Sequence, residues 1–268
     1  MGAENTIREN EGFTLIELLV VIAIIALLIS IIIPSLKKAK EQAQFIICQS
    51  NLHSYGIIGV MYTAENNGEF PYPWASIYNA FVLPGEIQRY CRWHNALYDL
   101  SQYPEYGGPL WPYLEMKGAN LCPKFKAVSK FRGKDHPLHV DSIPIVPQFG
   151  YSMNGFLGVY GGPSDGRQYY IDKISGIKRP ANVFYFAEEN MWGNKWAPNV
   201  LNDNALISQW DNTEIDLEKD SNIFIDAFAT FHKARDVDMN EGISNAVFVD
   251  GHVQIVEVKD THKFAWPY

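Results

Sequence analysis

A long apolar run near the N-terminus constrains this chain more than any other feature. From Phe13 to Ile33 there are 21 residues, and only Thr14, Glu17 and Ser30 among them are polar. As an α-helix, the run would measure roughly 30 Å, which is the thickness of the hydrocarbon core of a bilayer. It continues into PSLKKAKEQAQ, whereas a secretory signal peptide has a shorter apolar core and ends at a small-residue cleavage site. We therefore predict a membrane-crossing helix that stays attached to the chain.

The same helix is predicted to continue beyond Pro34 with a different character. Apolar residues recur at helical spacing as far as Tyr62, with lysine, glutamate and glutamine between them, so the helix becomes amphipathic. Read from about Thr14 to Glu65, it has about fifty residues and is on the order of 75 Å long. Pro34 removes one helical hydrogen bond and is expected to kink or melt the helix locally. The NNG sequence at positions 66–68 is expected to end it.

The front of the apolar run carries a specific motif. GFTLIELLVVIAIIALL, which begins at Gly12 and is followed by Pro34 at the end of the run, closely resembles the prepilin-type cleavage and methylation segment of type IV pilins and type II secretion pseudopilins. The resemblance implies that a prepilin peptidase cuts between Gly12 and Phe13, and that Phe13 becomes the N-methylated first residue. It implies assembly with other pilin or pseudopilin subunits through this segment, in which Glu17 and Pro34 are the assembly residues.

Glu17 poses a physical problem in such a segment. A carboxylate at the centre of a membrane helix costs at least about 2.5 kcal/mol unless it meets a partner. By the resemblance, the partner is the α-amino group of Phe13 on a neighbouring subunit, so that assembly neutralises the carboxylate. The alternative is a glutamate that snorkels from an ordinary signal anchor.

Further matches point to one subfamily. The sequences CQSNLHSYGIIGVMYTAENNGEFPY, LCPKF, YSMNGFLG, IKRPANVFYFAEEN and NAVFVDGHVQIV come in the order seen in large pseudopilin-like proteins of planctomycete, verrucomicrobial and lentisphaeral bacteria. Those proteins usually end in a processing-associated motif with a histidine, a nine-residue gap and Asp-Gly. Here 17 residues separate His232 from Asp250, so we interpret KARDVDMNEGI as an insertion.

The resemblance divides the chain into four parts. Residues 1–12 are the expected leader, 13–34 the transmembrane and filament-core helix, 35–66 its amphipathic continuation, and 67–268 a globular domain. The leader has few basic residues, whereas Lys37, Lys38 and Lys40 follow the run, so the positive-inside rule alone would place the C-terminal domain in the cytoplasm. We follow the processing motif instead. It implies a single pass through the bacterial inner membrane and a periplasmic domain.

The globular part is predicted to be α+β, with an antiparallel sheet packed on the amphipathic half of the helix and with long loops. NVFYFAEEN is expected to form a strand. NAVFVDGHVQIVEV is expected to form a hairpin, because Asp250-Gly251 is a strong turn signal between apolar residues.

Three cysteines are too few for a disulfide scaffold and lack zinc-site spacing. We favour a disulfide between Cys48 and Cys122, because Cys48 lies on the predicted helix and LCPKF resembles a strand end that could return to it. Cys91 is then expected to be a free, buried thiol.

Two groups of residues are candidates for metal binding. Asp236, Asp238 and Asn240 offer alternating oxygen ligands for Ca²⁺, although RDVDMNEG lacks the glycine of an EF-hand and is otherwise a solvated acidic loop. The second group comprises His232, Asp250 and His252, which flank the predicted hairpin and could hold zinc if they meet. The alternative is that each histidine only hydrogen-bonds the backbone at a turn.

Composition and motifs argue against several functions. The net charge is -8 and the basic residues form no stripe, so we expect no nucleic-acid partner. There is no Gly-x-Ser-x-Gly elbow, phosphate-binding glycine loop or HExxH pair, so catalysis is not expected. Glu188 and Glu189 are adjacent in a predicted strand and should therefore point to opposite faces, which does not suggest an acid–base pair.

The favoured function is therefore a structural subunit of a type IV pilus or type II secretion pseudopilus, with prepilin peptidase, other subunits and membrane lipid as partners. One alternative is a membrane-borne or filament-borne module that binds polysaccharide through aromatic loops. Its candidate residues are Tyr72, Trp74, Tyr78, Trp93, Tyr103, Tyr106, Trp111 and Tyr113. Another alternative is a tethered hydrolase that uses the His, Asp and Glu residues around the C-terminal hairpin.

Overall fold

The computed structural model describes residues 14–79, 100, 102–136, 139, 141–142, 144–158, 170–190, 192–193, 197, 204–209, 224–234 and 241–267. The chain divides into two compact units, Met1–Ala43 and Gln44–Tyr268. Several residues singled out in the sequence lie outside the described part, namely Gly12, Phe13, Cys91, Trp93, Asp236, Asp238 and Asn240.

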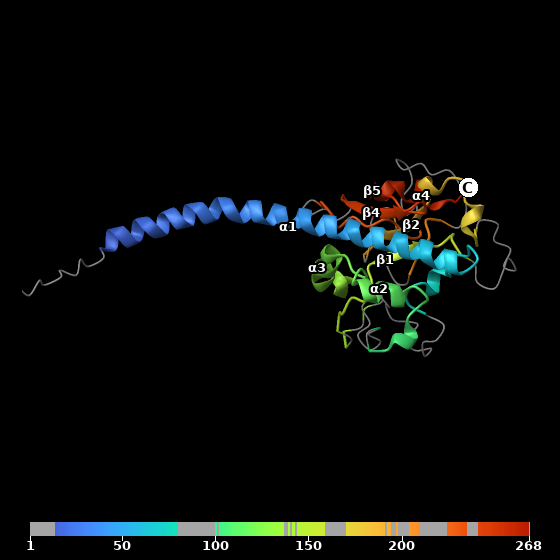
Figure 1. Ribbon diagram of the computed structural model, residues 1–268. Helices are drawn as coiled ribbons and strands as arrows, with labels where there is room; N and C mark the ends of the chain where they lie inside the picture. Colours follow the sequence, from blue (N-terminus) through green and yellow to red (C-terminus); the bar gives the residue numbers. More distant parts are fainter. Residues whose placement is uncertain are drawn as a thin grey trace, which may run out of the picture. The chain divides into compact units, whose positions relative to one another are not determined.

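Helix α1 spans Leu15–Glu65, within one residue of the prediction at its start (Figure 1). Of the two effects expected at Pro34, a kink or local melting, melting is wrong, because Pro34 lies inside a helix that continues on both sides of it. Proline removes only its own donor, and the neighbouring serines bond within the helix. The Ser30 hydroxyl donates to the Leu27 carbonyl at 2.6 Å, and the Ser35 hydroxyl donates to the Ile31 carbonyl at 3.2 Å.

The NNG sequence ends α1 as predicted. Asn67 and Gly68 have φ values of 53° and 78°, in the left-handed region that terminates helices. The Gly68 amide donates to the Thr63 carbonyl at 2.7 Å, which closes the last turn.

In the first unit, α1 is exposed on all sides. Every large apolar side chain between Leu15 and Ile33 is exposed, Leu15 by 79%. A helix that is apolar all round is stable only when lipid or other helices cover it. By length and composition, α1 could cross a membrane.

The second unit contains a five-stranded sheet in the order β3-β1-β2-β4-β5. The strands are β1 (Tyr151–Asn154), β2 (Phe184–Glu188), β3 (Ala205–Leu206), β4 (Ile243–Phe248) and β5 (Val253–Glu257). Three neighbouring pairs are antiparallel, while β1 and β3 are parallel. The α+β prediction is confirmed, with the correction that the sheet is mixed. The β4–β5 hairpin turns at Asp250-Gly251, where Gly251 has a φ of 91°.

Three shorter α-helices complete the described part: α2 (Trp111–Lys117), α3 (Pro123–Arg132) and α4 (Thr261–Ala265). Single 3₁₀ turns lie at Pro73–Ala75, Pro104–Tyr106, Gly133–Asp135, Ile174–Gly176, Pro180–Asn182 and Val258–Asp260.

The second half of α1 packs on the sheet through a stripe of buried residues. Cys48, Leu52, Tyr55 and Ile58 are fully buried and recur every three or four residues, which places them on one face of the helix. The Tyr55 ring lies 5.0 Å from that of Tyr151 in β1. This face brings α1, β1 and β2 around one core, and Cys48 lies at its N-terminal end.

Candidate functional site

The beginning of α1 holds Glu17 by local hydrogen bonds. The Thr14 amide donates to Glu17 Oε2 at 2.9 Å and the Thr14 hydroxyl donates to the same oxygen at 2.7 Å. In return, the Glu17 amide donates to Thr14 Oγ1 at 3.3 Å. This is a capping box, and its sequence signal is the Thr-x-x-Glu spacing, which our sequence analysis missed. The motif thus gives Glu17 a role in starting the helix, in addition to any role in assembly.

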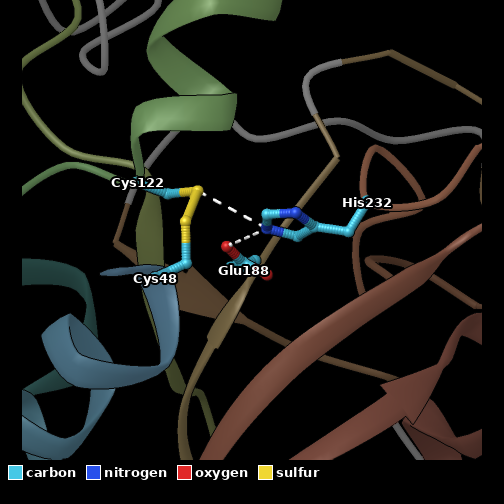
Figure 2. Close-up of side chains that lie close together, drawn as sticks. All are labelled: Cys48, Cys122, Glu188 and His232. Carbon is cyan, nitrogen blue, oxygen red and sulfur yellow. Dashed lines mark hydrogen bonds and ion pairs between the residues drawn. A yellow bond between two sulfur atoms is a disulfide. The ribbon is translucent and has the colours of Figure 1, made fainter. Parts of the chain in front are cut away.

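A second cluster lies in the core of the second unit, where Cys48, Cys122, Glu188 and His232 meet (Figure 2). Cys48 and Cys122 form a disulfide, which is the pairing that the sequence favoured. His232 Nε2 lies 2.8 Å from Glu188 Oε1 and 3.5 Å from Cys122 Sγ (Figure 2). None of the four side chains is more than 3% exposed.

The sheet holds the Glu188 carboxylate in one orientation through several hydrogen bonds. Glu188 is the last residue of β2, and β4 lies beside it in antiparallel register. Its Oε2 accepts from the Asn245 amide at 2.9 Å, from Asn245 Nδ2 at 3.3 Å and from the Ser244 hydroxyl at 3.3 Å. These bonds occupy Oε2 and leave Oε1 directed toward His232.

His232 is placed by its backbone and by aromatic neighbours. Its amide and carbonyl pair with those of Ile243 at the start of β4. The Phe45 ring lies 5.1 Å from the imidazole, edge to face, and the Phe231 ring lies 5.0 Å away. The result is an imidazole, a carboxylate and two sulfurs in a site that is almost completely buried.

Tyr151 lies close enough to this cluster for the charge of Glu188 to affect the pKa of its phenol. Burial raises the pKa of the Tyr151 phenol well above its ordinary value, and the Glu188 charge adds to the effect. The cluster therefore favours a neutral phenol beside the carboxylate.

The predicted zinc site of His232, Asp250 and His252 is not formed. His232 pairs with Ile243 at the beginning of β4, whereas His252 pairs with Phe248 at its end, about 17 Å further along the strand. His252 Nδ1 instead lies 2.6 Å from Asp250 Oδ1 in a pair that is partly exposed. No short-range sequence signal indicated that the partner of His232 is Glu188, 44 residues away.

Two of the aromatic residues proposed for polysaccharide binding lie in the core of the part of the chain that the structure describes. Tyr78 and Trp111 are core residues, 0% and 4% exposed. Tyr72, Trp74, Tyr106 and Tyr113 are half-buried, and Tyr103 is exposed. The Tyr113 hydroxyl donates to Glu65 Oε2 at 2.8 Å. Burial of Tyr78 and Trp111 removes two of the eight residues on which the binding hypothesis depends.

Comparison with known proteins bears on the N-terminal segment. A family model for the prokaryotic N-terminal methylation motif matches residues 7–33. The chain is also 43% identical over 60 residues to the type IV wide pilus major component PilA4 of Thermus thermophilus. That match covers 22% of this chain and 46% of PilA4, so the chain spans less than half the length of this relative. No solved structure matches. The resemblance of the N-terminal segment to prepilin-type proteins is confirmed.

Proposed function

We propose that this chain, which has the N-terminal segment of a prepilin-type protein, is a subunit of a type IV pilus or a type II secretion pseudopilus. The observation that carries the proposal is the combination of the methylation motif at residues 7–33 with a helical segment, from Leu15 to Ile33, whose apolar side chains are exposed on all sides. Such a helix requires lipid or other helices around it. A filament core made of many copies supplies such helices, and the membrane supplies lipid before assembly.

Processing and assembly are linked through Glu17. A prepilin peptidase cuts between Gly12 and Phe13, and the freed α-amino group of Phe13 is methylated. Both hydrogen bonds from Thr14 go to Glu17 Oε2, so Oε1 remains available to accept from the α-amino group of a neighbouring subunit. Pairing with that cation offsets the cost of the carboxylate in an apolar surrounding. The same pairing favours one register between adjacent helices.

The location follows from the same segment. The subunit spans the bacterial inner membrane once, with its leader in the cytoplasm and its α+β domain in the periplasm. After assembly, the helices form the filament core and the domain is displayed around it.

The test compares two polar residues of the same apolar helix. In the native bacterium, Glu17→Ala should leave the chain in the membrane fraction and abolish its recovery in sheared or cross-linked filaments. Ser30→Ala is the matched control, because the Ser30 hydroxyl bonds only within its own helix, to the Leu27 carbonyl at 2.6 Å, and should assemble normally. Equal assembly of both variants would contradict the role of Glu17.

Mass spectrometry of the purified native chain tests processing separately. We expect a mature chain that begins at an N-methylated Phe13. A chain that keeps residues 1–12 would reject cleavage by a prepilin peptidase, whatever the assembly assay shows.

A further inference from the structure

We propose that Cys48, Cys122, Glu188 and His232 form a Zn²⁺ site when the Cys48–Cys122 disulfide is reduced. The four residues offer one ligand atom each, and these atoms lie within 4.8 Å of one another. The second unit would then have two alternative cross-links at one place, a disulfide or a metal ion. This inference goes beyond filament assembly and does not depend on it.

The distances need little change to suit zinc. Tetrahedral Zn²⁺ with bonds of about 2.3 Å to sulfur and about 2.0–2.1 Å to nitrogen and oxygen separates its ligand atoms by about 3.3 to 3.8 Å. Cys122 Sγ and His232 Nε2 are already 3.5 Å apart. The 2.8 Å between His232 Nε2 and Glu188 Oε1 has to widen by roughly 0.5 Å. Opening the S–S bond lets the two sulfurs separate by side-chain rotation.

The surroundings of Glu188 resemble the support of a metal ligand. Residues around a metal site usually hold the first ligands by hydrogen bonds and so set their direction. Here Asn245 and Ser244 bind Glu188 Oε2, while Oε1 stays turned toward His232 and the sulfurs. The carboxylate is therefore oriented before any metal arrives, and the ordering cost of binding is reduced.

The ligand types select the metal. Two thiolates with an imidazole and a carboxylate suit Zn²⁺, whereas Ca²⁺ and Mg²⁺ require several oxygen ligands. All four side chains are buried, with the largest exposure at 3%. A closed site of four protein ligands is typical of structural zinc. The cysteines lack zinc-site spacing in the sequence because two of the ligands come from β2 and from the segment before β4.

Replacing the disulfide by a bound metal ion requires one dithiol reductant and one Zn²⁺. A dithiol reductant transfers two electrons and two protons to the disulfide, which becomes two thiols while the reductant becomes a disulfide. Zn²⁺ then displaces the two thiol protons and binds two thiolates, neutral His232 and the Glu188 carboxylate. Reoxidation of the thiolates by a disulfide of the same class returns the Cys48–Cys122 bond and releases the ion.

The test uses the full chain in detergent, oxidised or reduced with a phosphine that has no thiol. After gel filtration with Zn²⁺, we expect one Zn²⁺ per reduced chain and none per oxidised chain. With Co²⁺ as a probe, the reduced chain should show thiolate-to-cobalt charge-transfer absorption and the visible bands of a tetrahedral ion. Cys48→Ser, Cys122→Ser and His232→Gln should each weaken binding by at least about tenfold.

Two matched controls separate this site from adventitious binding. His252→Gln removes a histidine paired with Asp250 at the hairpin, and Cys91→Ser removes the third cysteine; both should bind as the unaltered chain does. Equal zinc binding in the oxidised and reduced chains, or loss of binding in either control, would overturn the proposal. If the reduced chain loses its near-ultraviolet circular dichroism, Zn²⁺ should restore it, and failure to restore it would count equally against the site.

Discussion

Glu188 is a carboxylate with no solvent contact whose Oε1 faces the His232 imidazole, while Asn245 and Ser244 donate to its Oε2. Its side chain is 0% exposed, and that of His232 is 3% exposed. Removing one partner of a buried pair costs far more than the pair contributes, because the group that remains is buried without that partner. A similar pair at the surface is worth about 0–1 kcal/mol.

The chain contains both kinds of pair, which permits a direct comparison. We predict that His232→Phe lowers the free energy of unfolding by about 3–5 kcal/mol. His252→Phe breaks the partly exposed pair with Asp250 and should cost at most about 1 kcal/mol. Denaturant unfolding of the detergent-solubilised, disulfide-bonded chain measures both. Comparable losses in the two variants would show that the Glu188 contact does not stabilise the core.

At Gly59, α1 lies close against Tyr185 of β2, with no room for a side chain. A Cβ added there would lie 1.9 Å from Tyr185 Cε1 in β2, and Tyr185 is only 1% exposed. We predict that Gly59→Ala destabilises the second unit by about 1–3 kcal/mol, although alanine favours a helix by about 1 kcal/mol over glycine. The melting temperature, followed by near-ultraviolet circular dichroism, should fall. Val60→Ala, at an exposed neighbour, should leave it within a few degrees.

At the scale of elements, α1 was predictable almost completely. Its apolar run, its amphipathic continuation and its NNG end are all local signals, and each has one structural meaning. Pro34 does not melt the helix, because a single missing donor does not outweigh the bonds of the turns on either side. The β4–β5 hairpin was equally predictable, since Asp250-Gly251 supplies the turn and Gly251 takes the positive φ.

Strands β1 and β3 could not be predicted from the sequence in the same way. Strand β1 alternates apolar and polar residues in the sequence YSMN, but it has only four residues and all four are buried, so the pattern is at the short limit of what identifies a strand. Strand β3 has two residues, too few for any periodicity. Its parallel pairing with β1 depends on contacts between residues about fifty positions apart, which no local pattern encodes.

The disulfide connects two elements, because Cys48 lies in α1 and Cys122 precedes the first turn of α3. The cysteines are 74 residues apart, and closing a loop of that length stabilises a fold by about 4 kcal/mol. We therefore predict that Cys48→Ser/Cys122→Ser, compared without added metal, lowers the free energy of unfolding by this amount. A reductant should cause a similar loss in the unaltered chain and none in the double variant. A loss in the double variant on reduction would point to another bond.

At the scale of the whole molecule, the proposed assembly segment was predictable and the buried cluster was not. The motif around Glu17 is contiguous, so the residues themselves identify it. The buried cluster consists of Cys48, Cys122, Glu188 and His232. These residues meet only after α1, α3, β2 and β4 have packed together. Sequence reasoning paired His232 with His252, its nearest histidine in the C-terminal part, because it had no means to place Glu188.

Several tyrosines of the core predict how stability depends on alkaline pH. Burial raises the pKa of the Tyr55, Tyr151 and Tyr185 phenols above the ordinary value of 10.0. In the unfolded chain these phenols lose protons near pH 10, while the folded chain keeps them. Stability is therefore full below pH 10 and falls as the pH rises above it, by about 1.4 kcal/mol per pH unit for each buried phenol.

Denaturant unfolding between pH 9 and pH 11 measures this slope. Tyr185→Phe should reduce this slope by the contribution of one buried phenol. A slope that does not change in this variant would mean that Tyr185 ionises without unfolding.

The disulfide between Cys48 and Cys122 has a further consequence for the integrity of the chain. It closes a covalent ring that contains every residue from 49 to 121. If a protease cuts the backbone once anywhere inside that ring, the two products remain bonded to each other and migrate together on a denaturing gel without reductant. A subunit nicked in this way would stay attached to its own membrane helix, and only a reductant would release the C-terminal fragment.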